Sequence, residues 1–176
     1  MIETLSIPAG IMAGDAMMKA ADVSLAAAQA VCAGKFIVAV SGDVAAVKAS
    51  LQAGKELAGA TLVDSMIIAN VDGQVPLAMN ACNEVNKVDA LGVLETFSLC
   101  AAVLAADAAV KAADVRLIEI RLGRGLGGKS FVILTGDVAA VTAAVKAAEG
   151  ADEVQGLMSQ SVVIPSAHPE IIKAII

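Results

Sequence analysis

The chain of 176 residues contains the same sequence pattern twice. Residues 2–23 (IETLSIPAGIMAGDAMMKAADV) return 92 positions later as residues 94–115 (LETFSLCAAVLAADAAVKAADV), with 12 of 22 positions identical. A second block, residues 34–47, returns 94 positions later as residues 128–141, with 9 of 14 identical. Solenoid repeats are shorter and more numerous. The sequence therefore predicts two copies of one small domain, and the second copy has gained two residues between Val115 and Gly128.

The length suits two domains near the lower end of domain sizes. We predict one domain at residues 1–80 and another at residues 81–176, with a linker at about residues 70–90. Although 58% of the residues are hydrophobic, the longest charge-free stretches hold about a dozen residues, fewer than the ~20 that a membrane-spanning helix needs. We therefore expect a soluble protein without a membrane partner. A net charge of -6 without a basic cluster argues against nucleic acid as a partner.

Both copies show the same order of predicted elements, β-α-β-β-α-β, which indicates a mixed α/β fold. Pro8 follows a serine and opens a helix rich in alanine and methionine. Asp43 and Asp137 are expected to cap the second helix of each copy with their side chains. In the first copy we expect strands at residues 1–4, 23–31, 36–41 and 62–69, and helices at residues 8–21 and 43–60. The second copy repeats this order from residue 91 to residue 165.

Several spaced motifs in this pattern resemble the bacterial microcompartment shell domain. They are the run A-L-G-x-[IL]-E-T, the helix D-A-x-x-K-A-A-D-V, a turn ending in G-K, and G-D-V-x-A-V. The motifs occur in both halves in unpermuted order, over nearly the whole chain, except that the first copy lacks the residues equivalent to A-L-G. The tandem-domain shell proteins of propanediol-utilisation-type microcompartments are the most similar, because their first copy carries a cysteine in the turn before G-K. This chain reads V-C-A-G-K there, at residues 31–35.

The resemblance implies a homotrimer whose six domains mimic a hexamer and tile with other shell proteins into a microcompartment shell. It also implies that the turn before G-K lines a central pore. A chain with two similar domains can form such a ring of three, in which the equivalent loops approach one axis. The expected pore-lining residues of the two copies are Ala33, Gly34, Arg124, Gly125, Leu126 and Gly127.

Cys32 is the cysteine of the first turn, and it stands opposite Leu126 when the two copies are aligned on their G-K lysines. A lone cysteine is commonly a small buried hydrophobic residue, so the residue type alone leaves its role open. In a trimer three Cys32 thiolates would meet at the axis. The resemblance implies that they bind a 4Fe-4S cluster there, with the fourth iron left for another ligand. Cys100 is expected to be a packing residue, and Cys82 an incidental thiol in the linker.

A competing motif is the stretch G-R-G-L-G-G-K-S at residues 123–130, which fits the phosphate-binding loop G-x-x-x-x-G-K-[ST]. That loop needs a helix directly after it, because the free amides of the helix start bind the phosphates. Here Ser130 instead opens the run SFVILTG, which is typical of a strand. We therefore favour a pore rim over a nucleotide site.

No catalytic constellation is apparent, since the chain has one histidine, His168, and no acidic cluster. The resemblance suggests that Lys19 and Lys111, at matching sites on the first helices, are lattice-edge residues; the alternative is an ordinary solvated lysine. The shell-domain motif I-P-R-P-H is altered to I-P-S-A-H at residues 164–168, so an arginine that supports edge contacts is missing.

Together these features predict a shell protein that is not an enzyme. The cluster would pass electrons across the shell, or it would be transferred intact to encapsulated redox enzymes. The alternatives are a plain metabolite pore and, from another class, a nucleotide-binding enzyme.

Overall fold

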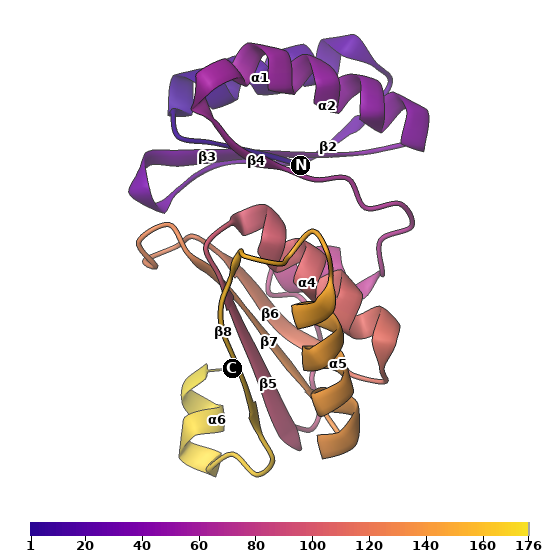
Figure 1. The fold of residues 1–176 in the computed structure, drawn as a ribbon, viewed down its shortest axis with the longest axis vertical. Helices are drawn as coiled ribbons and strands as arrows, with labels where there is room; N and C mark the ends of the chain where they lie inside the picture. Colours follow the sequence, from indigo (N-terminus) through magenta and orange to yellow (C-terminus); the bar gives the residue numbers. More distant parts are fainter. Residues whose placement is uncertain (176) are drawn as a thin grey trace. The chain divides into compact units, whose positions relative to one another are not determined.

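The structure is a computed structural model, and it describes residues 1–175. The chain divides into two compact units (Figure 1). The first unit contains Met1–Ala69 together with two short segments of the second copy, Ser98–Cys100 and Gly123–Gly128. The second unit contains the remaining residues. The predicted boundary at residue 80 stays a prediction, because the units do not follow a single cut in the chain.

The first unit has one antiparallel sheet with the strand order β2-β3-β1-β4. Helices α1 and α2 both lie on one face of this sheet (Figure 1). The bounds of the elements are β1 (Ile2–Thr4), α1 (Ile7–Ala20), β2 (Ser24–Val31), a 3-10 turn (Cys32–Gly34), β3 (Lys35–Ser41), α2 (Val44–Ala58), a second 3-10 turn (Gly59–Thr61) and β4 (Leu62–Ser65).

The second unit repeats this topology with the strand order β6-β7-β5-β8. A helix α3 (Gln74–Met79) precedes its sheet, and a helix α6 (Pro169–Ile175) follows it. Ile172 and Ile175 of α6 pack against the sheet cluster of Leu91, Ile118 and Ile133. The other bounds are β5 (Ala90–Thr96), α4 (Leu99–Ala112), β6 (Arg116–Leu122), β7 (Ser130–Gly136), α5 (Val138–Gly150) and β8 (Met158–Ile164). The predicted β-α-β-β-α-β order and the mixed α/β fold are thus confirmed.

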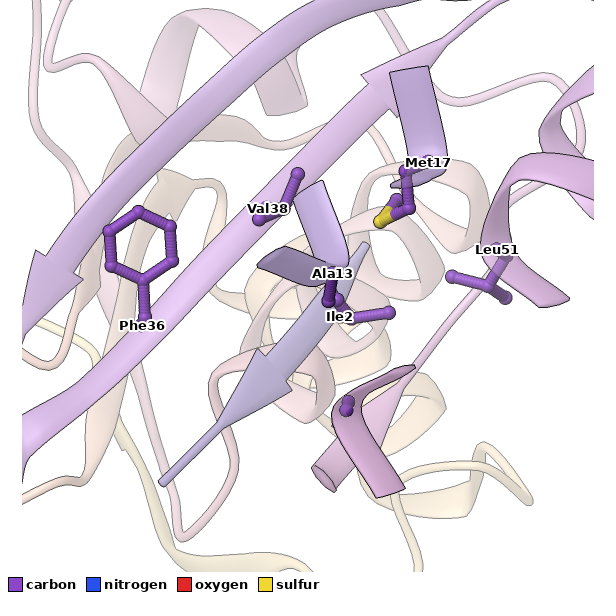
Figure 2. Packing of buried hydrophobic residues seen from close by; sticks show 7 residues of the cluster. Ile2, Ala13, Met17, Phe36, Val38 and Leu51 are labelled. Carbon is purple, nitrogen blue, oxygen red and sulfur yellow. The ribbon is translucent and has the colours of Figure 1, made fainter. Parts of the chain in front are cut away.

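The core of the first unit lies between the sheet and its two helices. Met17 of α1 and Leu51 of α2 lie near Ile2 of β1 (Figure 2). The Ser50 hydroxyl in α2 donates a hydrogen bond of 2.9 Å to the Met17 carbonyl, which ties the helices together. Helix α1 begins at Ile7, one residue before the predicted start at Pro8, and Ser6 caps it by accepting the Ala9 amide. No helix among the described residues combines the length and apolarity required to cross a bilayer.

Two predictions about element ends are wrong. The fourth strand was expected to reach Ala69 but ends at Ser65, since Ser65 already pairs with Ile2, the first residue of β1. Asp43 and Asp137 do occupy the N-cap positions of α2 and α5, but their side chains make no capping hydrogen bond. Their carboxylates still favour a helix start through the helix dipole.

The linker also differs from the expectation, because it contains α3. The Gln74 side chain in α3 accepts the amide of Leu117 at 3.0 Å and donates to the carbonyl of Val115, and so binds α3 to the edge strand β6. A helix of six residues carries too weak a pattern to be read from the sequence.

The strand registers locate the two extra residues of the second copy. Strand β2 pairs with β3 from Ser24↔Ser41 to Val31↔Lys35, and both copies have a register shift at the same point. In the second copy the ladder runs from Arg116↔Thr135 to Leu122↔Ser130. The gained residues therefore lie in the turn between the strands and leave the strands unchanged.

The core predicts a stability difference between two glycines. A Cβ atom at Gly10 would lie 2.7 Å from Phe36 Cβ and from Thr4 Oγ1, whereas one at Gly150 would meet nothing within 4 Å. We expect Gly10→Ala to lower the free energy of unfolding by about 1 to 3 kcal/mol through overpacking, although alanine is the better helix former. Gly150→Ala is the control and should be neutral or stabilising. Urea denaturation followed by circular dichroism measures both, and an unchanged midpoint for Gly10→Ala would contradict the packing described.

Candidate functional site

The turn between β2 and β3 holds Cys32 in a tightly bent, half-buried position. Ala33 has a φ of 61° and Gly34 a φ of 72°, so two consecutive residues adopt the left-handed conformation. Glycine does this at little cost, whereas alanine does not. Both residues are exposed. The turn therefore presents a short, strained backbone with one thiol on it.

The second turn belongs to the same compact unit and contacts the first directly. The Cys32 amide donates to the Gly123 carbonyl at 2.8 Å, and the Gly125 amide donates to the Cys32 sulfur at 2.7 Å. The guanidinium of Arg124 donates to Oε1 of Gln29 at 2.8 Å. The structure thus brings Cys32 together with Arg124 and Gly125. It also adds Gln29, which the sequence did not single out.

The second turn is long and open. Gly125 and Gly127 both have positive φ, and a Cβ atom at either position would meet nothing within 4 Å. Leu126 between them is half-buried. The predicted pore residues Ala33, Gly34, Arg124, Gly125, Leu126 and Gly127 therefore lie on two adjacent turns of one unit. Their lining of a pore remains a prediction.

A buried ion pair fixes both turns. Lys35 follows the first turn directly, and its ammonium lies 2.6 Å from Oε1 of Glu3, with the lysine side chain 10% exposed and the glutamate fully buried. Lys35 also donates to the carbonyl of Gly128 at 3.1 Å, and the Leu99 amide donates to Oε2 of Glu3 at 2.8 Å. A buried ion pair needs such additional bonds to offset its desolvation. The sequence signal for it was an acidic residue inside an apolar strand.

Glu3 of this pair also belongs to a group of potential metal ligands. Donor atoms of Glu3, Asp64 and Cys100 lie within 4.8 Å of one another. Burial raises the pKa of the Cys100 thiol well above its ordinary value, and the negative charge of Asp64 adds to the effect. The thiol is therefore protonated at neutral pH, and Lys35 already neutralises Glu3. These properties suit packing around an ion pair and not cation binding. Cys100 is fully buried, as predicted.

The phosphate-loop alternative loses its structural basis. Ser130 begins β7, so a strand and not a helix follows Lys129. The Ser130 hydroxyl is buried inside the unit and cannot reach a phosphate or its metal ion. The Lys129 ammonium is engaged by Glu95 at 2.8 Å and lies 5.4 Å from the centre of the Phe97 ring.

The two predicted edge lysines occupy equivalent places in the last turns of α1 and α4. Each forms an ion pair with an aspartate one turn earlier: Lys19 with Asp15 at 2.6 Å, and Lys111 with Asp107 at 2.5 Å. Lys19 is 74% exposed and Lys111 is 41% exposed. Both ammonium groups thus remain accessible from solvent, and their contact with a neighbouring tile stays a prediction.

Comparisons with known proteins agree with the duplicated architecture. The BMC domain family model matches residues 1–71 and 90–167. The bacterial microcompartment shell protein PduT of Citrobacter freundii is 41% identical over 167 residues, which cover 95% of this chain and 91% of that protein. Bacterial microcompartment shell protein PduA of the same organism is 43% identical over 86 residues, which cover 48% of this chain and 89% of that protein.

A solved structure agrees as well. The crystal structure of a microcompartment protein from Desulfitobacterium hafniense has a TM-score of 0.88 and 47% sequence identity, and the match covers 98% of this chain and 96% of that one. The family match spans both copies in order. The chain therefore belongs to the BMC domain family and is a structural shell protein of a bacterial microcompartment, built from two tandem shell domains.

Proposed function

We propose that the chain forms a homotrimeric shell tile in which three Cys32 thiolates, one from each chain, hold a 4Fe-4S cluster at a central pore. Two shell domains per chain give six domains per trimer, which surround one axis when three chains close into a ring. The tile is a structural component and not an enzyme. Other shell proteins of the lattice are its neighbours, and encapsulated redox enzymes are its functional partners.

The environment of the Cys32 sulfur carries this proposal. The sulfur accepts a hydrogen bond from the Gly125 amide, and hydrogen bonds to the sulfur atoms of iron–sulfur clusters tune their potential. The neighbouring Gly127 leaves open space around the turn. The other cysteines do not suit this role, because Cys82 lies in an exposed loop and Cys100 is buried. One suitable thiol per chain means that a cluster requires several chains.

The glycine turns and Arg124 would place a flexible, positively charged rim around such a cluster. Cys32 of each chain would hold the cluster, which would supply one-electron redox chemistry between a donor on one face of the shell and an acceptor on the other. Thiolate ligands and an open fourth iron position suit this role or the delivery of the cluster to enzymes inside. Arg124 is held by Gln29 beside the sulfur-binding turn. Its positive charge favours anionic small molecules at the rim.

Cysteine variants test the cluster. We expect Cys32→Ser, purified without oxygen, to lose its iron and acid-labile sulfide and to keep the trimer, because serine is close in volume and the turn is largely exposed. Cys82→Ser should keep the full cluster. Cys100→Ser should keep the cluster but lose stability, because a hydroxyl replaces a fully buried thiol. Iron, sulfide and protein assays together with size-exclusion chromatography give these values.

The parent protein should contain the iron of one cluster for three chains. One cluster per chain would exclude a shared axial site. If Cys32→Ser retained its full iron content, the redox role would be refuted and a plain metabolite-pore tile would remain.

The lysines of the last helical turns test the lattice. We expect Lys19→Ala combined with Lys111→Ala to impair sheet formation at high protein concentration while leaving the trimer intact, since both side chains extend to solvent from equivalent helices. Alanine preserves helix propensity. The matched control is Lys48→Ala combined with Lys146→Ala, which changes exposed lysines of α2 and α5. Electron microscopy scores the sheets. Equal sheet formation by both double variants would remove the edge assignment.

A further inference from the structure

The two copies contain equivalent Glu–Lys pairs with different exposure. In the second unit, Lys129 of β7 lies 2.8 Å from Oε1 of Glu95 in β5, and each side chain is 40% exposed. Glu95 and Lys129 stand 92 and 94 positions after Glu3 and Lys35, which are the offsets of the two repeated blocks. The chain therefore contains the same ion pair twice. The pair in the first copy is buried, and the pair in the second copy is partly exposed.

The cover of the first pair consists of two short segments. Leu99, which is fully buried, donates its amide to Oε2 of Glu3, and Gly128 accepts from Lys35. These residues belong to the segments Ser98–Cys100 and Gly123–Gly128, which are part of the first unit. The cover thus consists of the start of the first helix of a shell domain and the last residues of its turn.

The two glutamates differ in the oxygens that their known donors reach, because Glu3 accepts on both of its oxygens. Both described donors to Glu95, Lys129 and Ser159, bond to Oε1. In Glu3 the second carboxylate oxygen, Oε2, accepts the Leu99 amide. Glu95 has a lowered pKa because Lys129 and Ser159 donate hydrogen bonds to it. The carboxylate is therefore charged and ready to accept one more N–H group.

The repeat identifies a donor that fits this acceptor. Leu99 corresponds to Ile7, the first residue of α1, and Gly128 corresponds to Gly34, which precedes Lys35. The first amides of a helix have no acceptor within the helix itself. Ile7 is 38% exposed where Leu99 is fully buried, and Ile11 is 56% exposed where its counterpart Val103 is 2% exposed. The start of α1 is thus an apolar surface that lacks the cover its counterpart has.

We infer that Glu95 and Lys129 bind a second copy of this chain, with the Ile7 amide of that copy donating to Glu95 Oε2 and its Gly34 carbonyl accepting from Lys129. This contact reproduces between chains the contact that Glu3 and Lys35 make within the first unit. It is a head-to-tail interface, and such interfaces form rings when the rotation closes. The inference rests on the proposed trimer, for which it names the residues that join successive chains.

Variants on the two sides of the interface test it. We expect Glu95→Ala to raise the dissociation constant of the trimer at least about thirtyfold, because Lys129 would be buried without its partner. Ile7→Asp should do the same, since it places a carboxylate against Glu95. Aspartate at a helix start favours the helix, so α1 should stay folded. The control is Glu170→Ala, which removes one half of an exposed ion pair with Lys173.

Sedimentation velocity over a dilution series, recorded with interference optics because the chain has no Trp and no Tyr, gives the dissociation constants. Circular dichroism verifies that each variant is folded. Hydrogen exchange of a peptide covering residues 5–10 adds a second readout, since its amides should be protected in the parent trimer and exposed in Glu95→Ala. If the parent is a trimer and Glu95→Ala and Ile7→Asp associate as tightly as Glu170→Ala, this interface is wrong and the trimer stands. A parent that stays monomeric would instead refute the trimer itself.

Discussion

The buried ion pair between Glu3 and Lys35 is the interaction on which the arrangement of the candidate site depends. Two charges without water are stable only when every remaining polar group around them is bonded. Here the Leu99 amide and the Gly128 carbonyl meet that requirement. The pair consequently fixes the start of α4 and the end of the glycine-rich turn within the first unit. Cys32, three residues before Lys35, is held next to that turn and accepts a hydrogen bond from it.

Duplication followed by divergence explains why the site has one thiol per chain. The strands of the two copies keep the same registers, so the difference in length lies in the turn. The first turn is short and carries Cys32, while the second is two residues longer, rich in glycine and positively charged at Arg124. A shell built from one repeated domain would place six identical side chains around an axis. In the proposed trimer, two unlike copies would provide three thiols and three amide-bearing turns, a combination that suits a cluster.

The sequence predicted the element order, the two copies and the strand after Lys129 because each depends on a local pattern or on the repeat. It did not predict the contact between Cys32 and Gly125, which joins residues 93 positions apart. Nor did it predict α3, whose six residues pack on β6 through Gln74. The predicted fourth strand was too long, because the end of β4 at Ser65 is set by its pairing with β1. Pairings distant in sequence, unlike periodicity, leave no mark in a single chain.

Native mass spectrometry of protein purified without oxygen tests the central claim most directly, because it reports the number of chains and the bound metal in one species. Collision-induced dissociation of the complex would then show whether a single ejected chain carries the metal. The account predicts a trimer whose mass exceeds that of three chains by four iron and four sulfide ions, and single released chains without metal. A cluster carried by a released monomer, or a trimer that stays free of metal after reconstitution with iron and sulfide, would contradict it.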